Sequence, residues 1–231
     1  MVTVPSFAPS FASFVADGIR WLRRLQNADG GWPTFCRGWG RLPFDRSSPD
    51  LTAHALQALR TAGGAADDSA FRRGLRYLQN AQRENGSWVP LWFGSQHAQG
   101  KENPVLGTAL VLQALRELNV LHDQAESAAK FLIAAQNGDG GWGGGEGVAS
   151  SVEETARATG ALASCTCGAE ARLAAERGAA YLVGRIEDGS WAAPSPIGLY
   201  FASLWYSERL YPIIWTVEAL GRAARAGINV N

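Results

Sequence analysis

The sequence predicts an all-α protein: an α/α toroid-like array of about four helix hairpins, folded as a single domain over residues 1–231. A Gln-to-Trp turn recurs along the chain, and the segments between its copies place apolar residues at three- and four-residue steps. No segment shows convincing strand alternation. Because a single hairpin cannot bury its own apolar face, stacked hairpins form a curved array with one helix of each pair inside and one outside.

The recurring turn sets the boundaries of the repeats. In its first copy Trp21-Leu22 is followed at fixed offsets by Gln26, Gly30 and Trp32. The same offsets recur at Tyr77, Leu78, Gln82, Gly86 and Trp88, and at Phe131, Leu132, Gln136, Gly140 and Trp142. A fourth copy, ending at Trp191, is one residue shorter and has Ile186 in place of Gln. These matches predict repeats over about 12–63, 68–119, 122–166 and 169–227.

Each repeat has two helices. The first ends at the Gln-to-Trp turn, where glycine allows the chain to reverse. The second is predicted at 48–63, 103–118, 150–164 and 211–225. Ser48 or Asp50 caps the first of these helices, and Ser150 or Ser151 caps the third.

The Gln and Trp side chains suit a clamp between neighbouring repeats. A Gln amide can hold a backbone group of a neighbouring helix, and an indole covers apolar surface while donating its N–H. We therefore interpret Trp32, Trp88 and Trp142 as structural residues.

Composition bears on the size of the core and on binding to nucleic acid. With 46% hydrophobic residues the chain can bury a full core. Lys plus Arg and Asp plus Glu are equal at 21 each, so no net field attracts nucleic acid.

The cysteines and the N-terminus bear on location. Cys36, Cys165 and Cys167 fit neither a disulfide framework nor a four-ligand zinc site, which indicates a reducing compartment and a cytoplasmic protein. No signal peptide and no run of about 20 apolar residues is present, so any contact with a membrane is peripheral.

Several segments, taken in order, resemble the QW motifs of the squalene-hopene and oxidosqualene cyclases. They are "GIRWLRRLQNADGGWPTF", "LPFDRSSPDLTAHALQAL", "GSWVPLWFG", "GTALVLQAL", "QNGDGGWG", "ETARATGAL" and the closing "LYFASLWYSERLYP". The resemblance spans Gly18 to Arg225 and matches the C-terminal part of a hopene cyclase.

The resemblance implies an α/α toroid around an aromatic-lined apolar pocket and a class II terpene cyclase that protonates a polyprenyl substrate. In that family the acid is the central Asp of an Asp-x-Asp-Asp motif, which this sequence lacks. The family ring has six helix pairs, so we expect a homodimer or a partner subunit to complete the array. The alternative is a non-catalytic isoprenoid-binding or scaffold module.

Asp50 and His54 are the first candidate catalytic residues. "SPDLTAHAL" resembles the family segment whose Asp and His lie beside the catalytic acid, and residues four apart share a helix face. The structural alternative is an N-cap Asp and a satisfied buried His.

Glu154 is the third candidate acid. Glu153 and Glu154 open a predicted inner helix, where carboxylates interact favourably with the helix dipole. Two adjacent carboxylates near apolar walls can also raise each other's pKa enough to hold a proton. Glu154 or Asp50 is therefore the expected proton donor.

Aromatic residues are the candidate substrate-binding groups. Trp92 falls on a family aromatic that faces the pocket, with Phe93 beside it, although an ordinary core role explains both equally simply. A second cluster lies where the family places aromatics that stabilise carbocations: Tyr200, Phe201, Trp205, Tyr206 and Tyr211.

No cofactor or metal is predicted. Related prenyltransferases use an Asp, Cys and His set for zinc, and neither "CTC" nor the surroundings of the three histidines supply one. "GGWGGGEG" lacks the preceding strand and the Lys of a phosphate-binding loop.

Overall fold

The computed structural model describes residues 9–34, 45–63, 68–165, 167–195, 197–199 and 204–228. Its main helices are α1 (Pro9–Leu25), α2 (Pro49–Thr61), α3 (Ser69–Ala81), α4 (Pro104–Leu118), α5 (His122–Ala134), α6 (Val152–Ala163), α7 (Ala169–Glu187) and α8 (Tyr211–Arg225). Two single-turn helices, η2 (Gln99–Lys101) and η3 (Ser190–Ala192), lie in the connections. The predicted all-α fold is confirmed.

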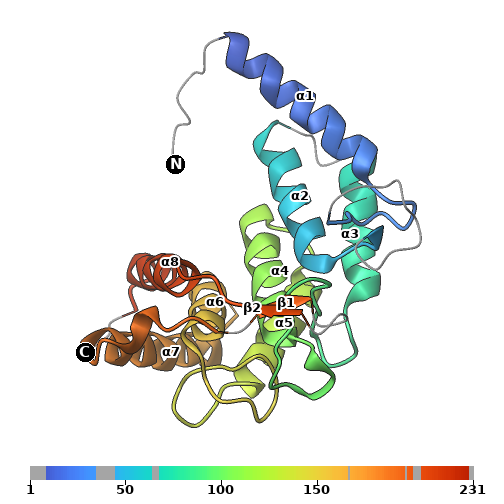
Figure 1. Cartoon of the computed structure of the whole chain (residues 1–231). Helices are drawn as coiled ribbons and strands as arrows, with labels where there is room; N and C mark the ends of the chain where they lie inside the picture. Colours follow the sequence, from blue (N-terminus) through green and yellow to red (C-terminus); the bar gives the residue numbers. More distant parts are fainter. Residues whose placement is uncertain are drawn as a thin grey trace.

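The helices form a curved two-layer array. The inner helices, α2, α4, α6 and α8, pack in that order, each against the next. The outer helices α3, α5 and α7 pack on α2, α4 and α6 respectively. Figure 1 shows the array as an arc, with α1 at one end and α7 and α8 at the other. The helix bounds agree with the predicted second helices to within two residues.

Helix starts follow local chemistry. Asn103 accepts a hydrogen bond at 3.0 Å from the backbone N–H of Leu106 and so caps α4, and Ser151 accepts one at 3.1 Å from Glu154 and caps α6. Ser48 occupies the N-cap position of α2 but makes no capping bond; its Oγ accepts from the backbone N–H of Leu91 instead.

The three complete Gln-to-Trp turns share one set of hydrogen bonds. Each Gln side chain donates both to the Gly of its own turn and to a carbonyl in the next outer helix; for Gln82 the acceptors are Gly86 and Gln124, at 2.9 and 3.0 Å. Gln26 and Gln136 do the same with Ala70 and Ala174. The turn of one repeat is thereby bonded to the outer helix of the next.

The indole completes the clamp. Trp88 is fully buried, its Nε1 donates to Leu78 O at 2.8 Å, and its backbone N–H donates to Thr108 Oγ1 at 2.9 Å. Equivalent bonds join Trp32 to Leu22 and Thr52, and Trp142 to Leu132 and Thr155. The structural interpretation of these tryptophans is therefore confirmed by their contacts.

The fourth copy departs from this pattern. Thr216 occupies the position of those threonines on α8 and is fully buried, yet its Oγ1 has no hydrogen-bond partner among the described residues. Trp191 lies instead in η3 and is only half-buried. The fourth turn, which lacks the Gln, packs on α7 and α8 through η3 but does not make the Trp–Thr bond of the other three.

Two features differ from the sequence prediction. A short antiparallel hairpin, β1 (Ile197–Leu199) and β2 (Leu204–Tyr206), precedes α8. Its aromatic and aliphatic residues favour strands, but three residues are too few to show an alternating pattern. The sulfur atoms of Cys165 and Cys167 are paired, although their spacing predicts no disulfide framework. The pair closes a very short loop, so it constrains the unfolded chain little; Cys36 lies outside the described residues.

The turn glycine provides a test of the clamp. At Gly86, where φ is +87°, an added Cβ would lie 2.4 Å from Ser127 O of α5, whereas at Gly147, where φ is +71°, it would meet nothing within 4 Å. Gly147→Ala should therefore cost about 1 kcal/mol of stability from backbone strain alone. Gly86→Ala should cost about 1–3 kcal/mol more, because α5 must move. Equal losses in denaturant unfolding would contradict the clamp.

Candidate active site

The clamp defines equivalent positions on the inner helices. Counting two residues back from Thr52, Thr108 and Thr155 gives Asp50 on α2, Leu106 on α4 and Glu153 on α6. All three are at most 1% exposed. The fold therefore places two carboxyl groups in the same buried position of two repeats, with an aliphatic side chain between them.

Asp50 is buried and hydrogen-bonded. The Ser48 hydroxyl donates to Oδ1, and Ser48 Oγ in turn accepts from the backbone N–H of Leu91 at 2.9 Å. Burial raises the pKa of Asp50, while the Ser48 hydrogen bond and the nearby His54 partly oppose that rise. This first-turn carboxyl is therefore held by its own helix start.

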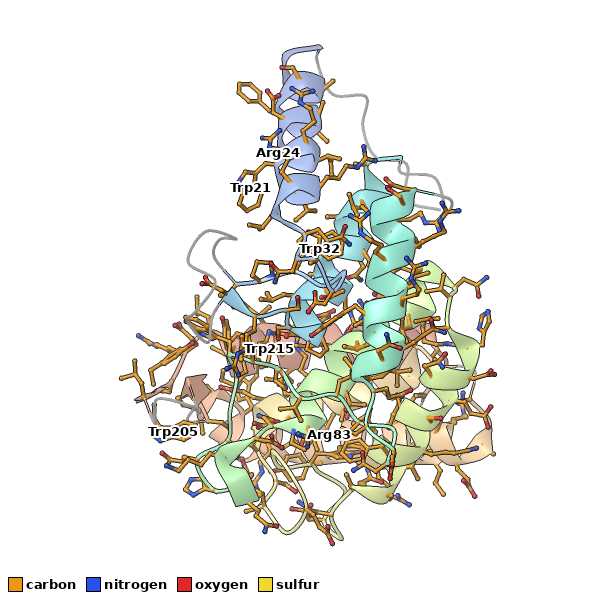
Figure 2. The ribbon with its side chains drawn as sticks, turned by 90° about the vertical axis from the view of Figure 1, so that its right-hand side faces the viewer. Trp21, Arg24, Trp32, Arg83, Trp205 and Trp215 are labelled. Atoms are coloured by element: carbon orange, nitrogen blue, oxygen red, sulfur yellow. A yellow bond between two sulfur atoms is a disulfide. The ribbon has the colours of Figure 1, made fainter. Side chains whose placement is uncertain are left out.

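His54 is exposed, which corrects the alternative of a satisfied buried histidine. It borders a shallow hollow of about 260 Å³, together with Trp21, Trp32 and Leu51. Figure 2 shows Trp21 and Trp32 near the junction of α1 with the rest of the array. No hydrogen bond joins His54 to Asp50, although both lie within the described residues.

Glu154 is buried and both of its carboxyl oxygens have donors. Asn103 Nδ2 donates to Oε1 at 2.9 Å, and the Ser151 hydroxyl donates to Oε2. These bonds tie the start of α6 to the start of α4. Both oxygens of Glu154 are therefore hydrogen-bonded within the array.

Among the three buried carboxyls at the starts of the inner helices, Glu153 has an oxygen without a hydrogen-bond partner; Asp45, in the segment before α2, is also buried and has two. Glu153 is 0% exposed; Oε1 accepts from the backbone N–H of Ser195 at 3.0 Å, and Oε2 has no hydrogen-bond partner among the described residues. Burial raises the pKa of Glu153 to about 8, and the charges of Glu154 and Glu208 add to that rise. Its equivalence to Asp50 could have identified it from the sequence, had the repeats been aligned on their threonines.

Aromatic side chains gather around the start of α6. Trp92 Nε1 donates to the hydroxyl of Tyr206 at 3.2 Å, which brings together two predicted substrate-binding residues 114 positions apart. Phe93 packs on a buried cluster that includes Val152 and Trp215. The predicted aromatics thus come from two segments and meet near one helix start.

Further aromatic residues extend this group. Tyr211 and Trp215 stack with ring centroids 4.4 Å apart, and the Arg157 guanidinium lies 4.2 Å from the Trp215 centroid. Trp215 belongs to this aromatic group, although the sequence did not predict it as a substrate-binding residue. Trp205 is half-buried on β2, and Figure 2 shows it beside the array, below Trp215 on α8. Tyr200 and Phe201 lie outside the described residues.

Other features of the molecule bear on the chemistry. A hollow of about 570 Å³ is lined by residues of α5, including Lys130, and of the connections beside it, including Glu102 and Glu146, and by none of the candidate site residues. Within the described ranges, no group of three or more His, Cys, Asp or Glu could hold a metal ion. No helix in that part of the chain has the length and apolar character needed to cross a membrane.

Comparison with known proteins gives one family. The model of the squalene-hopene cyclase C-terminal domain matches residues 7–96 and 42–225. Squalene--hopene cyclase from Bradyrhizobium diazoefficiens is 31% identical over 78% of this chain and 30% of its own length. Drimenyl diphosphate synthase from Streptomyces showdoensis is 33% identical over 79% of this chain and 34% of its own. The chain thus spans about a third of the length of these relatives.

Solved structures agree on the fold. A protein from Actinoplanes has a TM-score of 0.70 at 18% identity, covering 90% of this chain and 69% of its own. The ent-copalyl diphosphate synthase from Streptomyces platensis has a TM-score of 0.58 at 26% identity, covering 88% of this chain and 37% of its own.

The raised pKa of Glu153 predicts how stability depends on pH. Between its ordinary value of 4.5 and about 8, the folded state keeps the proton while the unfolded state releases it. The free energy of unfolding should therefore fall as pH rises through this window, by on the order of a few kcal/mol in total. Glu153→Gln has no proton to lose, so its stability relative to the wild type should rise with pH. Denaturant unfolding from pH 5 to pH 9 measures this, and parallel pH profiles would contradict it.

Proposed function

Because the chain belongs to the squalene-hopene cyclase C-terminal domain family, we propose that it acts in the protonation-initiated cyclisation of a polyprenyl substrate, as a class II terpene cyclase or a subunit of one. We place this activity in the cytoplasm, with peripheral access to the membrane in which polyprenyl chains partition. The observation that carries the proposal is the set of dry carboxyl groups at the starts of α2 and α6, with aromatic side chains beside α6.

The physical chemistry supports this assignment. Protonation of an alkene needs a neutral acid held away from water, and burial favours the neutral form of a carboxyl. The carbocation that forms must be stabilised by a group that does not react with it. The negative faces of Trp and Tyr rings provide this stabilisation. Trp92, Phe93, Trp205 and Tyr206 are the substrate-binding residues of this proposal.

The acid is placed among the buried carboxyls at the helix starts. Asp50, with His54 beside it, is the candidate that corresponds by position to the family segment. Glu154 is the candidate on α6. Both are proposals that mutation must test, since the sequence contains no Asp-x-Asp-Asp.

The exposed faces at the two ends of the helix array are suited to contact with a second copy of the chain. Ile214 and Val217 of α8 are 53% and 63% exposed, whereas the equivalent residues on α2, α4 and α6 are at most 1% exposed because another inner helix follows. At the other end, His54 and Ala58 of α2 are exposed, while their equivalents on α4, Leu110 and Ala114, are buried. The two end faces are thus the two halves of one repeat interface, and copies can join head to tail.

The cyclase activity can be tested directly. The purified protein is incubated with squalene, oxidosqualene and geranylgeranyl diphosphate, and products are identified by gas chromatography after dephosphorylation where needed. We expect a cyclised product from the wild type, and loss of about 100-fold or more in any variant that removes the acid, with Asp50→Asn and Glu154→Gln run in parallel. Binding of these compounds without any product would favour the non-catalytic isoprenoid-binding module.

Association through α8 has its own test. Ile214→Asp places a charge in the proposed interface and should shift the protein to monomers in size-exclusion chromatography with light scattering. Leu173→Asp is the matched control, because Leu173 is equally exposed on the outer helix α7. A wild type that is monomeric at high concentration would contradict a second copy as the partner and leave a different subunit as the alternative.

A further inference from the structure

The three buried carboxyls at the inner helix starts differ in how many of their oxygens are occupied. Asp50 accepts from the Ser48 hydroxyl on Oδ1. Glu154 has a donor on each oxygen. Glu153 has one occupied oxygen, and its Oε2 has no partner within the described part of the chain. A buried oxygen without a partner is costly, so it marks a group with a function or an unseen ligand.

The charges around Glu153 favour its neutral form. The charged groups that act on it are the carboxyls of Glu154, its neighbour on α6, and Glu208, which follows β2. Tyr211 of α8 is also close enough for its ionisation to be opposed by Glu153. Arg157, one turn further along α6, is paired with Glu218 at 2.9 Å and lies over the Trp215 ring. The charges that act on the pKa of Glu153 are both negative, so ionisation would place a negative charge beside two others in a dry setting.

We propose that Glu153 is the proton donor of this site, with the transferable proton on Oε2. This inference rests on the proposed cyclase function. Asp50 sits at the equivalent position of α2, two helices away, and packed helix axes lie about 8–10 Å apart. At roughly 16–20 Å the two carboxyls are too distant to share a proton, so Glu153 acts alone.

The proton transfer balances without another reagent. The π electrons of a terminal alkene form the new C–H bond to the proton on Oε2, the O–H pair stays on Glu153 as a carboxylate, and a tertiary carbocation forms on the substrate. The Ser195 N–H, already 3.0 Å from Oε1, stabilises the new carboxylate. The ring of Tyr211, which packs on the cluster that contains Val152, suits the cation. After the last proton leaves the product, Glu153 regains its own from water.

The test compares Glu153→Gln with Glu170→Gln. Both residues lie in the first turn of a helix, α6 and α7, but Glu170 is exposed. Product formation from the best substrate should fall about 100-fold or more in Glu153→Gln and stay at the wild-type level in Glu170→Gln. Glu153→Asp keeps the acid and should recover part of the loss. Activity of the wild type should decline as pH rises through about 8.

Infrared spectroscopy of the substrate-free protein gives a second, independent readout. The carbonyl band of a protonated carboxylic acid that Glu153→Gln removes should be present at pH 7 in the wild type, in Glu170→Gln and in Asp50→Asn, and should disappear well above pH 8. Wild-type product formation in Glu153→Gln, or absence of this band, would overturn the donor role while leaving the cyclase function standing. Absence of product from the wild type with the band present would instead contradict the cyclase function, and the catalytic role of Glu153 with it.

Discussion

The structure depends on the amide of one side chain that bonds to two carbonyls at once. In each complete turn the Gln amide joins its own glycine to the next outer helix, and the Trp indole fills the space beneath. Neither bond is strong alone, since a buried hydrogen bond contributes about 1 kcal/mol net. Their importance is geometric: they fix the next outer helix against the turn, and the bond from the Trp backbone N–H to a Thr fixes the inner helix that follows the turn. Because the same bonds recur, equivalent residues of successive inner helices are brought to one level.

The polar side chains of the candidate site lie at this level, at the starts of the inner helices. A helix start needs acceptors for its free N–H groups, and Ser, Asn and Asp supply them. In this chain the same turns also carry carboxyls that are buried by the neighbouring helix. Asp50 and Glu154 use their oxygens to hold helix starts in place, and Glu153 keeps one oxygen free. One structural layer therefore provides both the joints of the array and the dry acid that the proposed reaction requires.

The sequence predicted the helices well because a repeated pattern averages out local ambiguity. The offset from Gln to Trp and the apolar steps of the second helices located α2, α4, α6 and α8 within two residues. The β1–β2 hairpin was missed because each strand has only three residues. His54 is exposed because no described helix packs on that face of α2, whereas the equivalent Leu110 of α4 is buried; a periodic pattern does not show which face has a neighbour.

The hydrogen-bond partners of the carboxyls could not be predicted from the sequence. Glu153 and Glu154 are adjacent and chemically identical, and the sequence proposes Glu154 without information on which oxygens are bonded. The backbone of Ser195, 42 residues further along, occupies only one oxygen of Glu153, while Asn103 and Ser151 occupy both of Glu154. Trp92 and Tyr206 could be proposed as aromatics, but their contact depends on how the hairpin folds back. Short-range sequence patterns show where the repeats lie. Contacts in the folded chain determine which carboxyl oxygen has no hydrogen-bond partner.

The most direct test of this account is a crystal structure of the protein with a polyprenyl amine, whose ammonium group stands in for the carbocation. The account predicts electron density for the ammonium beside the start of α6, within reach of Glu153 and the faces of Trp92 and Tyr211. Density for the ammonium at the hollow lined by Glu102, Lys130 and Glu146, with none near α6, would contradict the placement of the active site.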